Sequence, residues 1–181
     1  ILETWFPTCI GGEIIAETLF GEYNPGGKLT VTFPRTTGQL QLNFPFKPGS
    51  HGGQPKWGPN GSGKTRVMGE LYPFGFGLSY TTFAYSNLRI RTSDNSRKGY
   101  YNVSVDVTNT GEYDGDEVVQ LYIRDKVGSV IPYDSLLKGF ERVSLRKGET
   151  KTLEFNLYPE DFQLLDRNME WTLESGDFEI M

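Results

Sequence analysis

The alternation of apolar and polar side chains along residues 101–108 is the strongest constraint on the fold of this chain. Successive side chains of a β-strand point to opposite faces, so a period of two predicts a strand with one buried face. An Asn-Thr-Gly turn at residues 109–111 ends this strand. The apolar positions are Tyr101, Val103, Val105 and Val107, and the polar ones are Asn102, Ser104, Asp106 and Thr108.

Further short apolar stretches follow, each separated from the next by turn residues. They lie at 119–123, 153–157, 162–165, 171–173 and 178–181. Several short strands without a long helical period indicate an antiparallel β-sandwich over residues 81–181. We expect its last strand to be missing or incomplete, which would leave an unpaired edge.

Residues 1–35 have the pattern of the end of an α/β unit. The sequence predicts the end of a strand at 1–6, a helix at 13–20 opened by paired glycines, a turn at 24–27 and a strand at 28–33. One helix and two short strands cannot enclose a core. We therefore expect this segment to be the C-terminal remnant of an α/β domain.

Residues 36–80 have the composition of a linker. Proline and glycine are concentrated between residues 45 and 63, where proline removes backbone donors and glycine adds backbone entropy. The sequence predicts an irregular strap there, of the kind that connects domains. The aromatic residues at 71–80 indicate that burial resumes at its end.

The stretch at residues 58–65, GPNGSGKT, matches the phosphate-binding pattern G-x-x-x-x-G-K-[ST]. That loop works only between a buried strand and a helix. The preceding residues 53–57 are not an apolar strand, and Pro73 follows too soon for a helix. We interpret the match as a coincidence of glycine-rich composition and predict no cofactor.

Other candidate residues have simpler explanations: we expect a solvated loop histidine at His51 and a small half-buried residue at Cys9. His51 is the only histidine and Cys9 the only cysteine, and neither has the partners of a metal site or an activated nucleophile. The acidic group at 112–117 departs from the spacing of a calcium loop, so we expect solvated charges and no metal. Its members are Glu112, Asp114, Asp116 and Glu117.

The net charge limits the kinds of macromolecule that this chain is expected to bind. The net charge is -5 and the sequence pI about 5.0, whereas nucleic acids and anionic membranes select concentrated basic surfaces. We therefore predict no nucleic-acid partner and no membrane partner.

Trp57 is the candidate for the rim of a sugar site, because sugar rings stack on exposed aromatic side chains. The alternative is that Trp57 pins the strap to a neighbouring domain.

Several motifs in order resemble family-3 glycoside hydrolases. Residues 11–29, GGEIIAETLFGEYNPGGKL, and 31–35, VTFPR, are similar to the end of that family's α/β-sandwich domain. Residues 71–83, LYPFGFGLSYTTF, resemble the entry into its fibronectin type III-like domain. Further similar stretches lie at 109–111, 118–122, 137–143 and 171–178, whereas PTCI at 7–10 departs from the family pattern.

The resemblance implies a mainly β chain: a fibronectin type III or immunoglobulin-like antiparallel β-sandwich, preceded by an α/β-sandwich remnant and a long Gly/Pro-rich linker. It implies retaining hydrolysis of terminal β-glucosides or β-xylosides by the parent protein, in a periplasmic or secreted location. The family's aspartate nucleophile lies in an N-terminal barrel and its glutamate acid/base earlier in the α/β domain. Glu13 and Glu17 fall on a later helix and receive no catalytic role, so we predict no catalytic residue in this chain.

Three functions remain open from the sequence. The first is an accessory portion that braces the missing barrel and α/β domains of the same protein, which bind the carbohydrate substrate. The second is an independent carbohydrate-binding module, and the third is a purely structural spacer. The resemblance favours the first.

Overall fold

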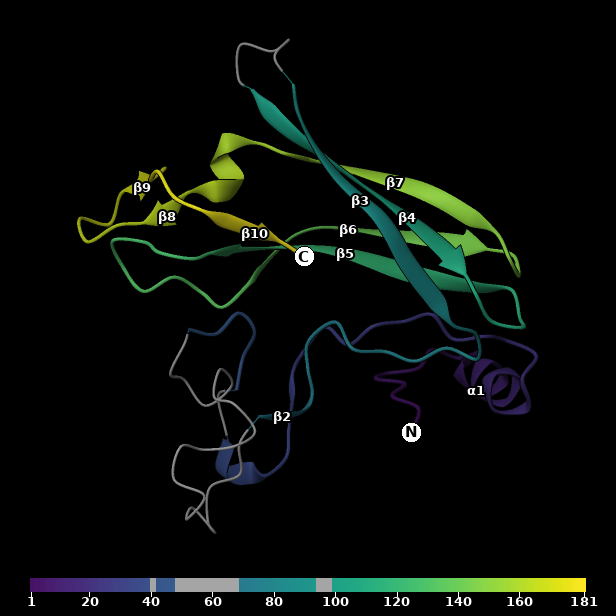
Figure 1. Ribbon diagram of the computed structural model, residues 1–181. Coiled ribbons are helices and arrows are strands. Elements are labelled where there is room, and N and C mark those ends of the chain that lie inside the picture. Colours follow the sequence, from purple (N-terminus) through teal and green to yellow (C-terminus); the bar gives the residue numbers. More distant parts are fainter. Residues whose placement is uncertain (40–41, 48–68, 94–98) are drawn as a thin grey trace, which may run out of the picture.

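The computed structural model describes residues 1–39, 42–47, 69–93 and 99–181. Its main body is a pair of three-stranded antiparallel sheets, with strand orders β3-β4-β7 and β10-β5-β6 (Figure 1). The expected antiparallel β-sandwich is therefore confirmed. The long strands are β3 (Phe83–Ser93), β4 (Tyr100–Asn109), β5 (Gly115–Asp125), β6 (Leu136–Leu145) and β7 (Thr150–Leu157).

The apolar alternation places one face of each sheet against the other. In β4, Val103 and Val107 are buried, and the same period buries Val119, Leu121 and Ile123 of β5. Val107 lies in one core cluster with Val119, while Val103 lies in a second cluster with Leu121 and Ile123. Burial of each such side chain contributes roughly 1.5–3 kcal/mol, so these strands account for much of the stability of the sandwich.

Two of the long strands, β3 and β6, were not predicted from the sequence. In β3 the register shifts between Ser86 and Arg89, and Asn87 adopts a φ of 53°. This bulge breaks the two-residue period that would have indicated the strand. In β6 the pattern is interrupted by Gly139, beside which β5 also shifts register between Leu121 and Tyr122.

The C-terminal part is only partly extended. The strand expected at 162–165 is divided into a 3-10 helix, η2 (Pro159–Phe162), and a short strand, β8 (Leu164–Leu165). Pro159 starts η2, and the Asp161 carboxylate accepts the Tyr158 backbone N–H at 2.9 Å. The remaining elements are β9 (Trp171–Thr172), which pairs with β8, and β10 (Phe178–Ile180), which pairs with β5.

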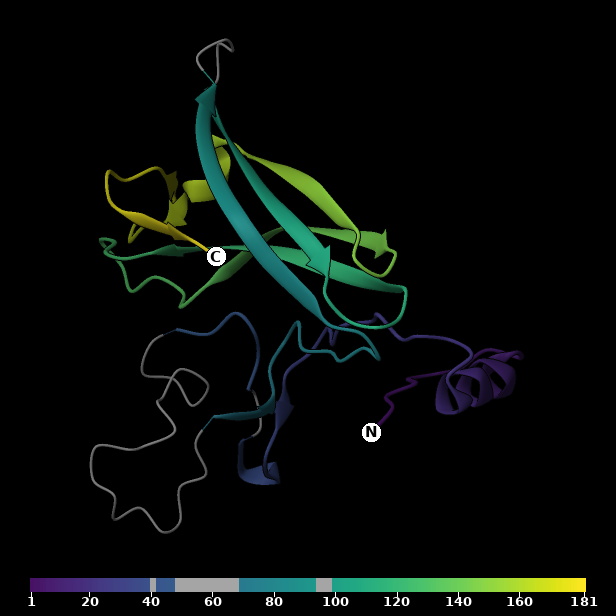
Figure 2. The same cartoon turned by 45° about the vertical axis from the view of Figure 1, so that its right-hand side comes forward.

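The described residues among 1–80, which are 1–39, 42–47 and 69–80, lie along one side of the sandwich (Figures 1 and 2). Helix α1 (Gly11–Phe20) confirms the expected helix, and the left-handed Gly21 ends it. The other elements are β1 (Phe33–Pro34), η1 (Thr37–Gln39) and β2 (Glu70–Tyr72), with β1 paired to β2.

Two expected strands are absent from the described part of this segment. Residues 1–6 form no strand, and Trp5 has a φ of 51°, which interrupts an extended backbone. Of residues 28–33, only Phe33 is in a strand. Leu29 instead donates its backbone N–H to the Phe76 carbonyl at 2.8 Å. The hydrogen-bond partner of this backbone group is therefore a turn segment and not a neighbouring strand.

Candidate functional site: the docking joint

Several residues singled out in the sequence lie outside the described residues. These are Trp57, His51 and the phosphate-loop match at 58–65. Cys9 is exposed, so the expectation of a half-buried residue there is wrong. Among the described residues, no group of three or more His, Cys, Asp or Glu side chains is arranged to hold a metal ion, and no helix is long and apolar enough to cross a membrane.

The carboxylates of the acidic group after β4 each interact with a different part of the protein. Glu112 pairs with Lys147, whose backbone N–H also donates to Asp114 at 2.8 Å. Asp116 accepts the Arg142 Nε–H at 2.9 Å. Hydrogen bonds from Ser144 and Arg142 hold the pKa of the Asp116 carboxyl below its usual value.

Glu117 contradicts the expectation that each of these carboxylates is solvated. Only 8% of this residue is exposed. Its Oε2 lies 3.0 Å from Lys28 Nζ, and its Oε1 accepts the Tyr85 hydroxyl at 2.9 Å. A buried carboxylate needs such partners, because desolvation without them is costly. The local sequence does not indicate that Glu117 is buried, because its partner Lys28 lies 89 residues away along the chain.

Residues 24–29 and 73–81 pack together against β5 and the turn between β4 and β5. We call this contact the docking joint. Lys28 belongs to its first segment and also donates to the Gly77 carbonyl of the second at 3.4 Å. The ion pair with Glu117 therefore ties both segments to the sandwich.

The Tyr85 hydroxyl extends this network onto β3. Partial burial, together with the hydrogen bond to Glu117, raises the pKa of Tyr85 well above its ordinary value. The phenol therefore stays neutral and acts as a hydrogen-bond donor to the carboxylate. The buried carboxylate thus has the Tyr85 hydroxyl as a second partner beside Lys28.

Asn24 is the second polar link of the docking joint. Its Nδ2 donates to the Asp114 carbonyl at 2.9 Å, and its Oδ1 accepts both the Ser79 hydroxyl at 2.7 Å and the Tyr80 backbone N–H at 2.8 Å. One side chain thus connects both joint segments to the turn after β4. The adjacent Tyr80 hydroxyl donates to the Thr18 carbonyl near the end of α1 at 2.7 Å.

Glycines allow the backbones of the joint to approach closely. A Cβ on Gly26 would lie 2.6 Å from the Asp116 carbonyl oxygen, and one on Gly77 would lie 2.3 Å from the Gly27 carbonyl oxygen. Real Cβ atoms do not tolerate such distances, so these positions require glycine for packing. The joint is a tightly fitted contact and not a loose tether.

Aromatic rings close the other end of the joint. Phe44 stacks on Phe74 with ring centroids 4.4 Å apart, and its edge meets Tyr122 of β5 at 5.8 Å. The Gln120 side-chain amide donates to the Gly75 carbonyl at 3.1 Å beside them. Of the aromatics at 71–80 that the sequence predicted to be buried, Tyr72, Phe74 and Phe76 are half-buried and Tyr80 is exposed.

Helix α1 presents a different kind of surface. Ile14, Leu19 and Phe20 are exposed, the last two by 65% and 85%. Phe6 before the helix is 98% exposed. Large exposed apolar side chains are characteristic of an interaction surface, so α1 and the residues before it carry apolar side chains suited to burial against another element.

Comparison with protein families gives two matches. The glycosyl hydrolase family 3 C-terminal domain matches residues 1–80, and the fibronectin type III-like domain matches residues 117–181. Together these two matches include most of the docking joint and the strands β5 to β10.

Individual relatives match along almost the whole chain. A beta-xylosidase of Formosa agariphila is 44% identical over 182 residues, and a periplasmic beta-glucosidase of Salmonella typhimurium is 40% identical over 188 residues. Each match covers 99% of this chain but 24% of the relative.

Solved structures give the same result. A beta-glucosidase from Listeria innocua superposes with a TM-score of 0.84 at 32% identity, over 98% of this chain and 25% of that one. A β-glucosidase from Erythrobacter marinus gives 0.81 at 38% identity, over 94% and 22%. The chain thus spans about a quarter of the length of the relatives it matches. It belongs to glycoside hydrolase family 3 and corresponds to the C-terminal region of the family's members.

Proposed function

We propose that this chain is the C-terminal accessory portion of a retaining β-glycosidase that hydrolyses terminal β-glucosides or β-xylosides. It has a bracing role and no complete active site. The observation that carries the proposal is the docking joint, in which the buried Lys28–Glu117 pair and close glycine contacts fix the α/β-type segment to the sandwich. The names of the relatives supply the substrate class.

The proposed organisation assigns residues 1–35 to the end of the α/β-sandwich domain, 36–80 to the linker and 81–181 to the fibronectin type III-like sandwich. The partners are the barrel and the rest of the α/β domain of the same protein, with the carbohydrate bound through the parent. The exposed apolar side chains of α1 are the ones that the rest of the α/β domain covers. We also place the parent in the periplasm or outside the cell, in line with the name of the Salmonella relative.

An assay of the isolated chain tests the absence of a complete active site. Purified chain mixed with an aryl β-glucoside or an aryl β-xyloside should release aglycone no faster than buffer does. Turnover that copurifies with the chain through several columns would refute this part of the proposal. Calorimetry against cellobiose and xylo-oligosaccharides tests the alternative function, since a binding module gives saturable heat.

Trp57 remains the candidate for the rim of the sugar site. Trp57→Ala in a hybrid enzyme that carries this chain should raise KM for an aryl glycoside while Tm stays unchanged. A fall in Tm with an unchanged KM would instead support the alternative role, in which the indole pins the linker to its neighbour.

A further inference from the structure

Helix α1 is held to the rest of the molecule near its C-terminal end. Within the described residues it packs broadly against no other helix or strand, and its buried residues are Gly11 and Thr18. Gly11 lies against Pro7 of the preceding segment, where an added Cβ would meet the proline ring. Thr18 lies toward the other end of the helix, and its carbonyl meets Tyr80 of the docking joint. The link between α1 and the sandwich therefore runs through the end of the helix.

The Tyr80 hydroxyl supplies a hydrogen bond that α1 needs at this end. The last four carbonyls of a helix have no partner within a regular helix. The Thr18 carbonyl accepts the Gly21 backbone N–H at 3.3 Å and the Tyr80 hydroxyl at the shorter distance of 2.7 Å. The last turn of α1 contains no basic residue, so the phenol of Tyr80 fills the role that a lysine or arginine often has at a helix end.

The backbone of Tyr80 is fixed to the base of β4. Its N–H donates to Asn24 Oδ1 at 2.8 Å, and Asn24 donates to the Asp114 carbonyl in the turn after β4 at 2.9 Å. The next residue, Thr81, donates its hydroxyl to Asn109 Oδ1 at 2.7 Å. Both Thr81 and Asn109 are buried. The Tyr80 side chain thus reaches from an anchored backbone to the helix.

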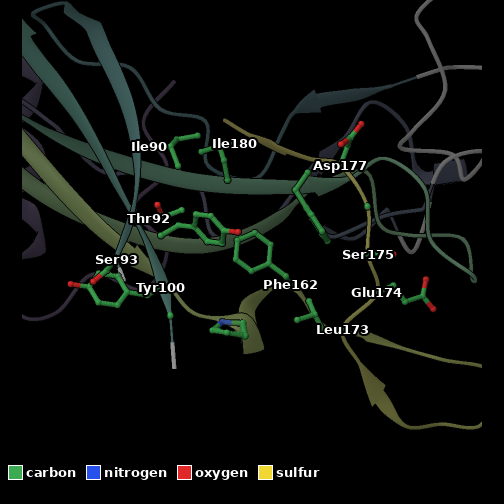
Figure 3. A pocket seen from close by; sticks show the side chains of 15 residues that line it. Ile90, Thr92, Ser93, Tyr100, Phe162, Leu173, Glu174, Ser175, Asp177 and Ile180 are labelled. Atoms are coloured by element: carbon green, nitrogen blue, oxygen red, sulfur yellow. The ribbon is translucent and has the colours of Figure 1, made fainter. Parts of the chain in front are cut away.

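The groove on the other side of the sandwich gives α1 no second anchor. This groove of about 910 Å³ lies between β3 and β10 (Figure 3). Ile90, Phe162 and Ile180 line it, and its described lining contains no residue before Ile90. The far end of α1 lies about 15 Å from the Tyr80 contact, as the rise of a helix of this length requires. A small rotation about that contact therefore moves the far end of the helix most.

We propose that Tyr80 is a positioning residue of the parent enzyme. Its hydroxyl fixes the end of α1, and through α1 the α/β domain, relative to the sandwich. In the proposed function, on which this role rests, the apolar side chains of α1 pack against that domain. Tyr80 touches no substrate in this role. A misplacement of about 1 Å in an enzyme can cost a large factor in rate, so loss of the hydroxyl acts on turnover through the position of the domain.

A distance measurement on the isolated chain tests the position of α1. Cys9 is exposed, is the only cysteine of the chain and lies shortly before α1. One spin label on Cys9 and a second on the variant Glu141→Cys, at an exposed position of β6, report the distance between the helix and the sandwich by pulsed electron resonance. Tyr80→Phe, which removes the hydroxyl alone, should broaden the distance distribution at least about twofold. Tyr113→Phe, at an exposed position, should leave it unchanged.

The hybrid enzyme that carries this chain gives the functional measurement. Tyr80→Phe should lower kcat for an aryl β-xyloside on the order of fivefold and leave KM within about twofold. Tyr113→Phe should change neither constant. A hydrogen bond with a structural role alone would lower Tm and leave kcat unchanged.

Two results would overturn the role given to Tyr80. The first is an unchanged distance distribution in Tyr80→Phe, and the second is an unchanged kcat in a hybrid that is active before substitution. A hybrid without activity before any substitution would instead count against the proposed function. The distance measurement would then decide by itself whether Tyr80 fixes α1.

Discussion

At the scale of single residues, the least expected feature is the buried charge of Glu117. The sequence predicted a solvated charge there, because the acidic group at 112–117 departs from the spacing of a calcium loop and Gly111 and Gly115 are typical of an exposed turn. Its burial depends on Lys28 and Tyr85, which come from distant parts of the chain, so no local pattern indicates it. The burial of Val103 and Val107, in contrast, follows from their two-residue spacing alone.

Glu117→Gln should destabilise the chain by about 3 kcal/mol, because removal of one partner leaves the Lys28 ammonium buried without a counter-charge. The matched control is Glu112→Gln, which breaks the exposed pair with Lys147 and should cost less than about 1 kcal/mol. Urea unfolding measures both. Equal losses in the two variants would contradict the assigned role of Glu117.

Gly26→Ala should destabilise the docking joint by roughly 1–3 kcal/mol, because the added methyl group meets the Asp116 carbonyl. Gly27→Ala is the neighbouring control, since a Cβ there meets nothing within 4 Å. Thermal unfolding compares the two. If Gly27→Ala is the more damaging change, close packing at Gly26 is not what fixes the joint.

Because of Tyr85, we expect the free energy of unfolding to decline at alkaline pH. Its folded-state pKa is raised, so the stability it contributes is complete below the ordinary tyrosine pKa of 10.0 and is lost as pH rises above that value. Tyr85→Phe should therefore flatten the fall in unfolding free energy above pH 10. Tyr113→Phe, at a 63% exposed position, serves as the control. An unchanged slope in Tyr85→Phe would contradict the role given to this hydroxyl.

At the scale of elements, the strands with uninterrupted alternation were predictable and those with bulges were not. β4, β5 and β7 follow the expected pattern, whereas the bulge at Asn87 hides β3. Helix α1 was predictable from its paired glycines and helix-forming residues. The exposure of its apolar side chains was also expected, since the helix and the short strands near it cannot enclose a core.

Helix α1 should contribute little to the stability of the sandwich. Leu19→Gln should change the unfolding free energy by less than about 0.5 kcal/mol, as is usual for an exposed position, whereas Val107→Ala should cost about 2 kcal/mol. Chemical denaturation compares them. A large loss in Leu19→Gln would mean that α1 is packed within this chain and is not a surface for the α/β domain.

At the scale of the whole molecule, the family and the fold class followed from motifs spread along the chain, and the comparisons confirm both. The domain boundaries and the role of Trp57 stay proposals. The docking joint was not predictable, because it joins residues 24–29, 73–81 and β5 through contacts that depend on the folded arrangement. Those contacts connect an α/β-type segment to a sandwich, which is the property a brace requires.

The most direct test of the bracing role measures kcat/KM of a hybrid enzyme. The hybrid joins the N-terminal three quarters of the Formosa agariphila beta-xylosidase to this chain, in place of the matching region. We expect it to hydrolyse an aryl β-xyloside, and the same enzyme truncated before that region to lose at least about 99% of kcat/KM. A truncated enzyme as active as the hybrid would contradict the account.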